Sequence, residues 1–86
     1  MDVKTFRSSY AWKKKRKEIK SLYDNKCQLC NSSKNLQVHH IVSIDTLPEL
    51  RLENNNLVLL CDKCHIAVHN GLISQTKLKN ITKAHT

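Results

Sequence analysis

Eight side chains that can bind metal ions are interleaved along this chain of 86 residues. They form two Cys-x-x-Cys pairs, one pair of adjacent histidines, and two further histidines one helical turn apart. In chain order they are Cys27, Cys30, His39, His40, Cys61, Cys64, His65 and His69. Thiolates and imidazoles are ligands of zinc and of other first-row transition metals. Core packing is a poor explanation for so many of them in so short a chain, so we expect two metal sites.

The four cysteines have the spacing of a structural zinc site. The two-residue gap within each pair lets both thiolates reach one ion at about 2.3 Å, and four thiolates complete the tetrahedron of structural Zn²⁺. A disulfide and a redox-active Cys-x-x-Cys are the alternatives, but no βαβ pattern surrounds either pair. The chain has only one Phe, one Trp and two Tyr for its core. A bound Zn²⁺ would therefore carry much of the folding free energy.

Positive charge is concentrated in the first half of the chain. Residues 1–43 carry 10 Lys and Arg against 3 Asp and Glu, and the whole chain has a formal net charge of +8. Such a region is typical of proteins that bind nucleic-acid phosphates. The side chains that we expect to contact phosphate are Lys13, Lys14, Lys15, Arg16, Lys17 and Lys20. A solubilising surface and a nuclear localisation signal are the alternatives for this run.

A helix should carry these basic residues. Ser8-Ser9 can cap its start, and Asp24-Asn25-Lys26 breaks it after about Tyr23. Its apolar side chains fall on one stripe at helical spacing, namely Trp12, Ile19, Leu22 and Tyr23. Five consecutive basic residues cannot all face one direction on a helix, so some should reach a ligand while others stay in water.

Two strands should follow the first cysteine pair. Residues 36–42 are β-prone and alternate between two faces, so His39 and His40 should point in opposite directions and can hold different roles. Residues 43–55 are expected to form a loop with a short helical turn, and residues 57–60 a short buried strand.

A second helix should present the last two histidines. Asp62 can cap a helix of about residues 62–70, and Asn70-Gly71 can end it, which puts His65 and His69 on one face. Residues 72–86 should form either a short helix or a frayed tail. We expect the function to survive the loss of most of them.

The order and spacing of these motifs resemble the HNH endonuclease family, the ββα-metal nucleases. The resemblance is carried by residues 36–41, by residues 55–65 and by His69, and it covers about residues 6–70. The flanking cysteine pairs are similar to those of the zinc-containing branch. The stretch Ser9-Tyr10-Ala11-Trp12-Lys13-Lys14 is similar to the basic helix that precedes the motif in small phage and bacterial members.

The resemblance implies a role for each histidine. His40 takes the position of the general base, while His39 and His65 take positions on the catalytic metal ion, and His69 adds a third imidazole. His69 contacting a phosphate or merely packing remain alternatives. Asn56 matches the middle residue of the motif, whose amide orients the base. Many members have Asp where His39 stands, although colicin-type members are similarly rich in histidine.

The nitrogen-rich set affects the choice of catalytic ion. Imidazoles favour Mn²⁺, Co²⁺, Ni²⁺ or Zn²⁺ over Mg²⁺, which prefers oxygen ligands. We therefore predict one α+β domain spanning residues 1–86, stapled by structural Zn²⁺, with a basic N-terminal helix and a central ββα-metal motif. Its expected activity is metal-dependent cleavage of DNA. The main alternative is a non-catalytic, zinc-dependent DNA-binding module, which has no need of His40, Asn56 and His65 together. A metal-buffering or redox protein would leave the basic helix unexplained.

The cellular setting is also an expectation. No run approaches the roughly 18 apolar residues of a membrane span, and the first residues lack the apolar stretch of a signal peptide. We expect a cytoplasmic protein of a bacterium or its phage that binds DNA, as a monomer or a homodimer. The resemblance favours association with phage packaging proteins over restriction or homing.

Overall fold

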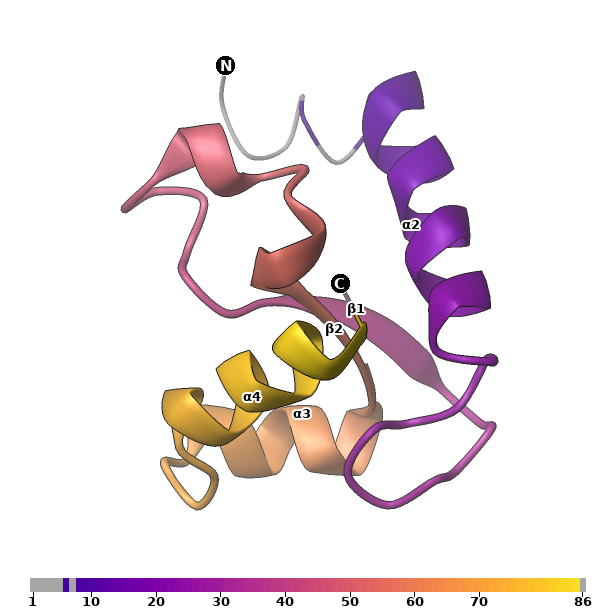
Figure 1. Cartoon of the computed structure of the whole chain (residues 1–86), viewed down its shortest axis with the longest axis vertical. Coiled ribbons are helices and arrows are strands. Elements are labelled where there is room, and N and C mark those ends of the chain that lie inside the picture. The colour runs from indigo at the N-terminus through magenta and orange to yellow at the C-terminus, as the bar shows by residue number, and fades with distance from the viewer. Residues whose placement is uncertain (1–5, 7, 86) are drawn as a thin grey trace.

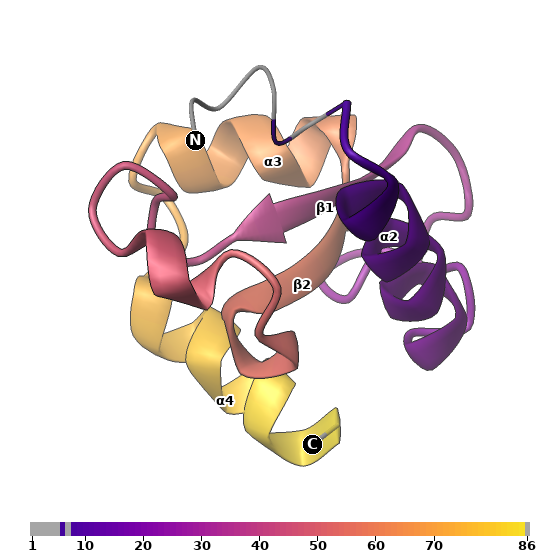
Figure 2. The same cartoon turned by 90° about the horizontal axis from the view of Figure 1, so that it is seen from above.

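The computed structural model describes residue 6 and residues 8–85 of the chain (Figure 1). In chain order its elements are α2 (Tyr10–Leu22), β1 (Leu36–His40), the 3-10 turns η1 (Pro48–Leu50) and η2 (Asn54–Asn56), β2 (Leu57–Cys61), α3 (Asp62–His69) and α4 (Gln75–His85). The two strands form an antiparallel sheet. Helix α2 lies on one side of this hairpin (Figure 1). Helices α3 and α4 lie on opposite sides of the two strands (Figure 2). The predicted α+β class is confirmed.

Helix α2 begins and ends where the sequence predicts. The Ser9 hydroxyl accepts a hydrogen bond from the Trp12 amide at 3.2 Å, which satisfies a backbone donor of the first turn. The helix ends before Asp24 and Asn25, whose φ angles of 56° and 54° are left-handed. The predicted apolar stripe is wrong for Leu22, which is 36% exposed, because its position lies at the margin of the stripe rather than at its centre.

The sheet pairs the two strands that should carry the site. Leu36 pairs with Cys61 at one end, and His40 pairs with Leu57 at the other. All five residues of β2 are buried, as its continuous apolar sequence predicts. Strand β1 ends at His40 rather than at the predicted residue 42, because the backbone of Val42 hydrogen-bonds to the Asn56 side chain instead of continuing the ladder.

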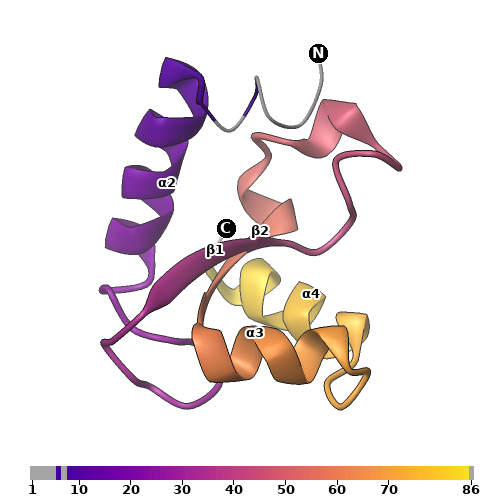
Figure 3. The ribbon, with the colours of Figure 1, turned by 180° about the vertical axis from the view of Figure 1, so that it is seen from behind.

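Helix α3 follows β2 without a linker and runs below β1 in Figure 3. The predicted cap at Asp62 is wrong. Cys61 occupies the cap position, and its Sγ accepts a hydrogen bond from the Cys64 amide at 3.4 Å. The predicted end of the helix is confirmed, since Gly71 has a φ of +75° after Asn70, a conformation that glycine adopts without strain.

The last residues form helix α4, so the alternative of a frayed tail is wrong. Leu78 and Thr82 of this helix are 0% and 1% exposed. Leu78 belongs to the same core as the β2 leucines, and α4 contacts both β2 and η2. The core therefore extends beyond residue 70, where the family resemblance ended. None of the helices in the described part of the chain is both long and apolar enough to cross a membrane.

Replacing Leu78 should destabilise the whole domain. Leu78→Ala leaves a cavity against β2, and we expect it to lower the free energy of unfolding by about 2–4 kcal/mol. Lys79→Ala, at the exposed neighbouring position, is the control and should change it by less than about 0.5 kcal/mol. Urea denaturation followed by circular dichroism measures both. Equal midpoints for Leu78→Ala and wild type would show that α4 is dispensable for folding.

Candidate functional site

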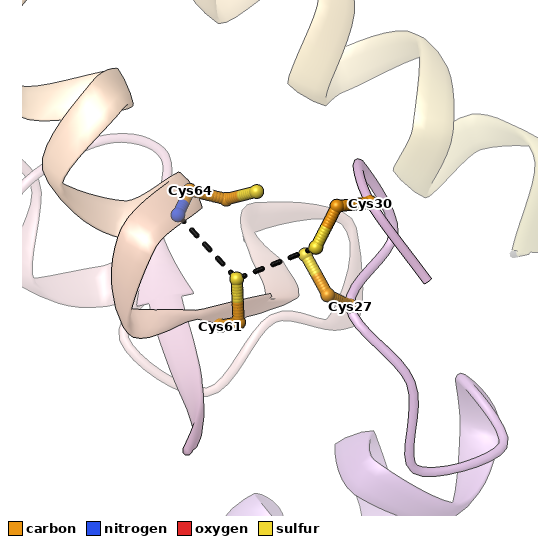
Figure 4. Close-up of side chains that lie close together, drawn as sticks. All are labelled: Cys27, Cys30, Cys61 and Cys64. Carbon is orange, nitrogen blue, oxygen red and sulfur yellow. Dashed lines mark hydrogen bonds between the residues drawn. The ribbon is translucent and has the colours of Figure 1, made fainter. Parts of the chain in front are cut away.

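Four cysteine side chains converge at one end of the sheet (Figure 4). Cys27 and Cys30 come from the loop after α2, Cys61 ends β2, and Cys64 lies in the first turn of α3. Their sulfur atoms all lie within 4.8 Å of one another, and the Sγ atoms of Cys30 and Cys61 are 3.5 Å apart. All four are free thiols. This arrangement suits one tetrahedral ion with thiolate ligands, such as zinc.

Backbone hydrogen bonds shape the first cysteine loop. The Cys27 amide donates to the Ser32 carbonyl at 2.8 Å, and the Asn31 amide donates to the Cys27 carbonyl at 2.9 Å. Asn31 has a φ of 68°, which lets the chain turn sharply after Cys30. The Gln28 amide donates to the Leu59 carbonyl at 3.0 Å, so the loop is attached to β2. Both cysteine pairs are therefore held by the same strand.

The thiols of this cluster differ in acidity. Burial opposes ionisation of Cys27, but backbone N–H groups that point at its sulfur outweigh burial and lower its pKa to about 6. One of these donors is the Leu29 amide, 3.5 Å from the Cys27 Sγ. Burial, followed by the neighbouring thiols, raises the pKa of Cys64. Four neighbouring thiolates would repel one another, and a bound metal ion supplies the positive charge that offsets this repulsion.

Three histidines form a second cluster between β1 and α3. His39 comes from β1, while His65 and His69 lie one turn apart on the same face of α3, as predicted. One ring nitrogen from each lies within 4.8 Å of the others. The Nε2 atoms of His65 and His69 are 3.2 Å apart, and the ring centroids of His39 and His65 are 5.1 Å apart. The three nitrogens are close enough to bind one ion.

The His39 ring is uncharged at neutral pH. Burial, followed by the charges of His65, His69 and His40, lowers the pKa of His39 to about 4. Desolvation and like charges both oppose protonation of an imidazole. A neutral ring retains a nitrogen lone pair, so His39 can bind a cation without first releasing a proton.

His40 makes different contacts from those of His39, as the alternation along β1 predicts. Its Nε2 lies 2.9 Å from the Arg51 carbonyl oxygen. Its ring stacks on Trp12 with centroids 4.9 Å apart and an interplanar angle of 26°. The Phe6 ring meets it edge-on, with centroids 6.2 Å apart. A carbonyl only accepts hydrogen bonds, so Nε2 is the donor, and in the neutral ring Nδ1 then carries the lone pair.

Asn56 ties the loop to the end of β1. This residue is 4% exposed. Its Oδ1 accepts from the Val42 amide at 2.8 Å, and its Nδ2 donates to the carbonyls of Val42 at 3.1 Å and Leu50 at 3.2 Å. Leu50 immediately precedes Arg51, whose carbonyl holds His40. The side chain therefore fixes both the strand that carries His40 and the loop that orients its ring. The neighbouring Asn54 and Asn55 are exposed.

The three-histidine cluster and His40 line the same cavity, which has a volume of about 230 Å³. Its polar lining consists of His39, His40, Ser43, Asp45, His65 and His69. Ser43 and Asp45 were not predicted from the sequence, because loop residues have no periodic pattern that indicates their neighbours. The Arg51 carbonyl was not predicted either, since a backbone contact does not depend on residue type. Trp12 was predicted only as a core residue.

The basic residues of α2 do not share one environment. The Nζ of Lys15 lies 3.1 Å from a Glu18 carboxylate oxygen and donates to the Asn54 Oδ1 at 2.9 Å. Lys15 thus joins α2 to η2, a contact that helical spacing alone cannot reveal. Lys13, Lys14, Arg16 and Lys17 are exposed, and Lys20 is partly buried. Arg16 and Lys20 line a hollow beside β1.

Comparison with known proteins agrees with this site. The model of the family described as HNH endonuclease matches residues 27–71, which is more than half of the chain. The matched segment includes both cysteine pairs and the four histidines of the site. Searches of curated proteins and of solved structures found no match. The family carries a nuclease-type or DNA-binding function, and its zinc-containing branch is consistent with the four-cysteine cluster. This chain belongs to the HNH endonuclease family.

Proposed function

We propose that this protein is a metal-dependent endonuclease that hydrolyses phosphodiester bonds in DNA. The observation that carries the proposal is the shared cavity, in which three converging imidazoles and the separately held His40 meet. Phosphodiester hydrolysis requires a cation beside the developing negative charge and a base for the attacking water. A module that only binds DNA requires neither of these.

His39, His65 and His69 would hold the catalytic ion. A bound divalent ion supplies positive charge beside the scissile phosphate and the leaving oxygen. With imidazole ligands from all three residues, the favoured ions are Mn²⁺, Co²⁺, Ni²⁺ and Zn²⁺, with Mg²⁺ less suited. The neutral state of His39 at physiological pH supports this ligand role.

His40 would act as the general base. Its Nε2 donates to the Arg51 carbonyl, so Nδ1 accepts the proton of the attacking water. The water oxygen bonds to phosphorus as the bond from phosphorus to O3′ breaks. This leaves a 5′-phosphate and an O3′ alkoxide, which becomes a 3′-hydroxyl by taking a proton from solvent. Stacking on Trp12 holds the ring plane, and Asn56 positions Arg51 through Leu50.

The four cysteines would hold a structural Zn²⁺. This ion would join the loop after α2 to the start of α3, next to the candidate ligand His65. It would thereby help to position the catalytic site as well as stabilise the fold.

DNA would be held through the phosphates that face the basic side chains of α2. Lys13, Lys14 and Lys17 are exposed and available for phosphate contact. Lys15 would act mainly through its contact with Asn54. The similarity of the N-terminal helix to that of small phage and bacterial members favours association with phage packaging proteins. We further propose a cytoplasmic setting, with the protein acting as a monomer or a homodimer.

His40→Ala should abolish DNA cleavage without loss of fold or DNA binding. The variant lacks the proton acceptor but retains every candidate metal ligand, so we expect at least about 100-fold slower cleavage. Nicking of supercoiled plasmid, with Mg²⁺, Mn²⁺, Co²⁺, Ni²⁺ or Zn²⁺ added singly, measures the effect beside wild type. Wild-type protein that binds the plasmid but leaves it intact with every ion would favour the zinc-dependent DNA-binding module.

Asn56→Ala should reduce cleavage on the order of 100-fold, because the loop would no longer hold the His40 ring in place. It should also lower the free energy of unfolding by about 1–3 kcal/mol, since the backbone groups of Val42 lose their partner. Asn55→Ala, at an exposed neighbouring position, is the control and should leave both unchanged. Single-turnover cleavage and urea denaturation measure the two effects. Equal rates for the two variants would remove Asn56 from the site.

A further inference from the structure

A second hollow adjoins the catalytic cavity between α2, β1 and α3. It has a volume of about 300 Å³ and is lined by Trp12, Arg16, Lys20, Leu36, Gln37, Val38, His40 and His65. His40 and His65 also line the cavity of the three histidines, so these two rings lie between the hollows. We name the second hollow the α2 groove.

Two of the six basic residues expected to contact phosphate line the α2 groove. Arg16 and Lys20 lie one turn apart on α2, on the same side as Trp12, and both line the groove. Lys14 and Lys17 follow Trp12 by two and five positions, which places them on the other side of the helix. Lys15 is bonded to Glu18 and Asn54. Of the six basic residues expected to contact phosphate, Arg16 and Lys20 are therefore the two that line the groove.

The lining suits one phosphodiester unit. Arg16 offers a planar set of donors that fits phosphate oxygens, and Lys20 offers a point charge. Gln37 adds an amide donor from β1, and none of the described residues that line the groove is acidic. A volume of about 300 Å³ lies at the lower end of the range for ligand pockets, so the groove fits a single nucleotide unit rather than a duplex.

We propose that the α2 groove binds the phosphodiester next to the scissile one on the strand that is cut, through Arg16 and Lys20. This inference rests on the proposed nuclease function and extends it, because it assigns a second phosphate site and a path for the substrate strand. The remaining exposed lysines of α2 then contribute general attraction to DNA, while Arg16 and Lys20 fix the register of the strand over His40.

Binding alone provides the first test. Trp12 is the only tryptophan of the chain and lines the groove, so a bound strand should change its fluorescence. The test variant is Arg16→Gln with Lys20→Gln, and the charge-matched control is Lys14→Gln with Lys17→Gln. Binding of a fluorescein-labelled DNA duplex is followed by anisotropy under conditions that saturate each variant.

We expect bound DNA to change the Trp12 emission of wild type and of the control, but not that of the groove variant. DNA that binds without changing wild-type Trp12 emission would overturn the inference, and so would a groove variant that retains the change. Failure of wild type to bind DNA would overturn both the inference and the proposed function.

Cleavage provides the second test. A duplex cut at a mapped position is prepared with one uncharged methylphosphonate at each phosphate in turn, on either strand. Wild type and control should lose at least about 10-fold in kcat/KM when the phosphate next to the cut, on the same strand, is neutralised. The groove variant should cleave the unmodified duplex at least about 10-fold more slowly than wild type. Its kcat/KM should fall little further when the phosphate next to the cut is replaced by a methylphosphonate.

Equal sensitivity of the groove variant and wild type to the methylphosphonate would overturn the inference, as would a sensitive phosphate only on the opposite strand. A wild-type protein that binds DNA but cuts none would refute the proposed nuclease. The Trp12 measurement would still decide whether the groove holds DNA, so the two failures are distinguishable.

Discussion

Cys61 lies where the strand, the helix and the four-cysteine cluster of this domain meet. It is the last residue of β2, and its sulfur caps α3 by accepting a hydrogen bond from the Cys64 amide. The same sulfur lies 3.5 Å from the sulfur of Cys30. His65 follows Cys64 directly, so the direction in which α3 leaves the strand also sets the position of a candidate metal ligand. In a domain with so few aromatic residues, this junction is a constraint on which both the fold and the site depend.

A second constraint positions His40 by means that do not involve metal. Asn56 connects Val42 to Leu50, and the next carbonyl along the chain, that of Arg51, receives the Nε2–H of His40. Trp12 covers the ring. His39 lies among the imidazoles that can bind an ion, while His40 is held by backbone and aromatic contacts. The proposed base and the candidate metal ligand can therefore be adjacent in sequence without competing for the same ion.

Sequence patterns predicted the parts of this domain that depend on local spacing. Ser9 and Gly71 marked helix ends because caps act within a few residues. Alternation along β1 predicted different roles for His39 and His40, and the two rings have different neighbours although both line one cavity. Long-range packing was beyond such patterns. Leu78 is buried against a strand far from it in the chain, Lys15 bonds to Asn54 across the domain, and the carbonyl of Arg51 has no signature in its side chain. The division of the basic run between groove and solvent likewise emerges only once α2 is packed beside β1.

We propose that this small domain holds two separate metal ions with different roles. Native mass spectrometry of protein purified with zinc and then equilibrated with Ni²⁺ or Mn²⁺ counts the ions in each chain. Wild type should bind two ions, and His65→Ala should keep its fold and one ion, because the four cysteines are intact while the histidine set loses a ligand. A single ion in folded wild-type protein, or two ions retained with unchanged affinity in His65→Ala, would contradict the account.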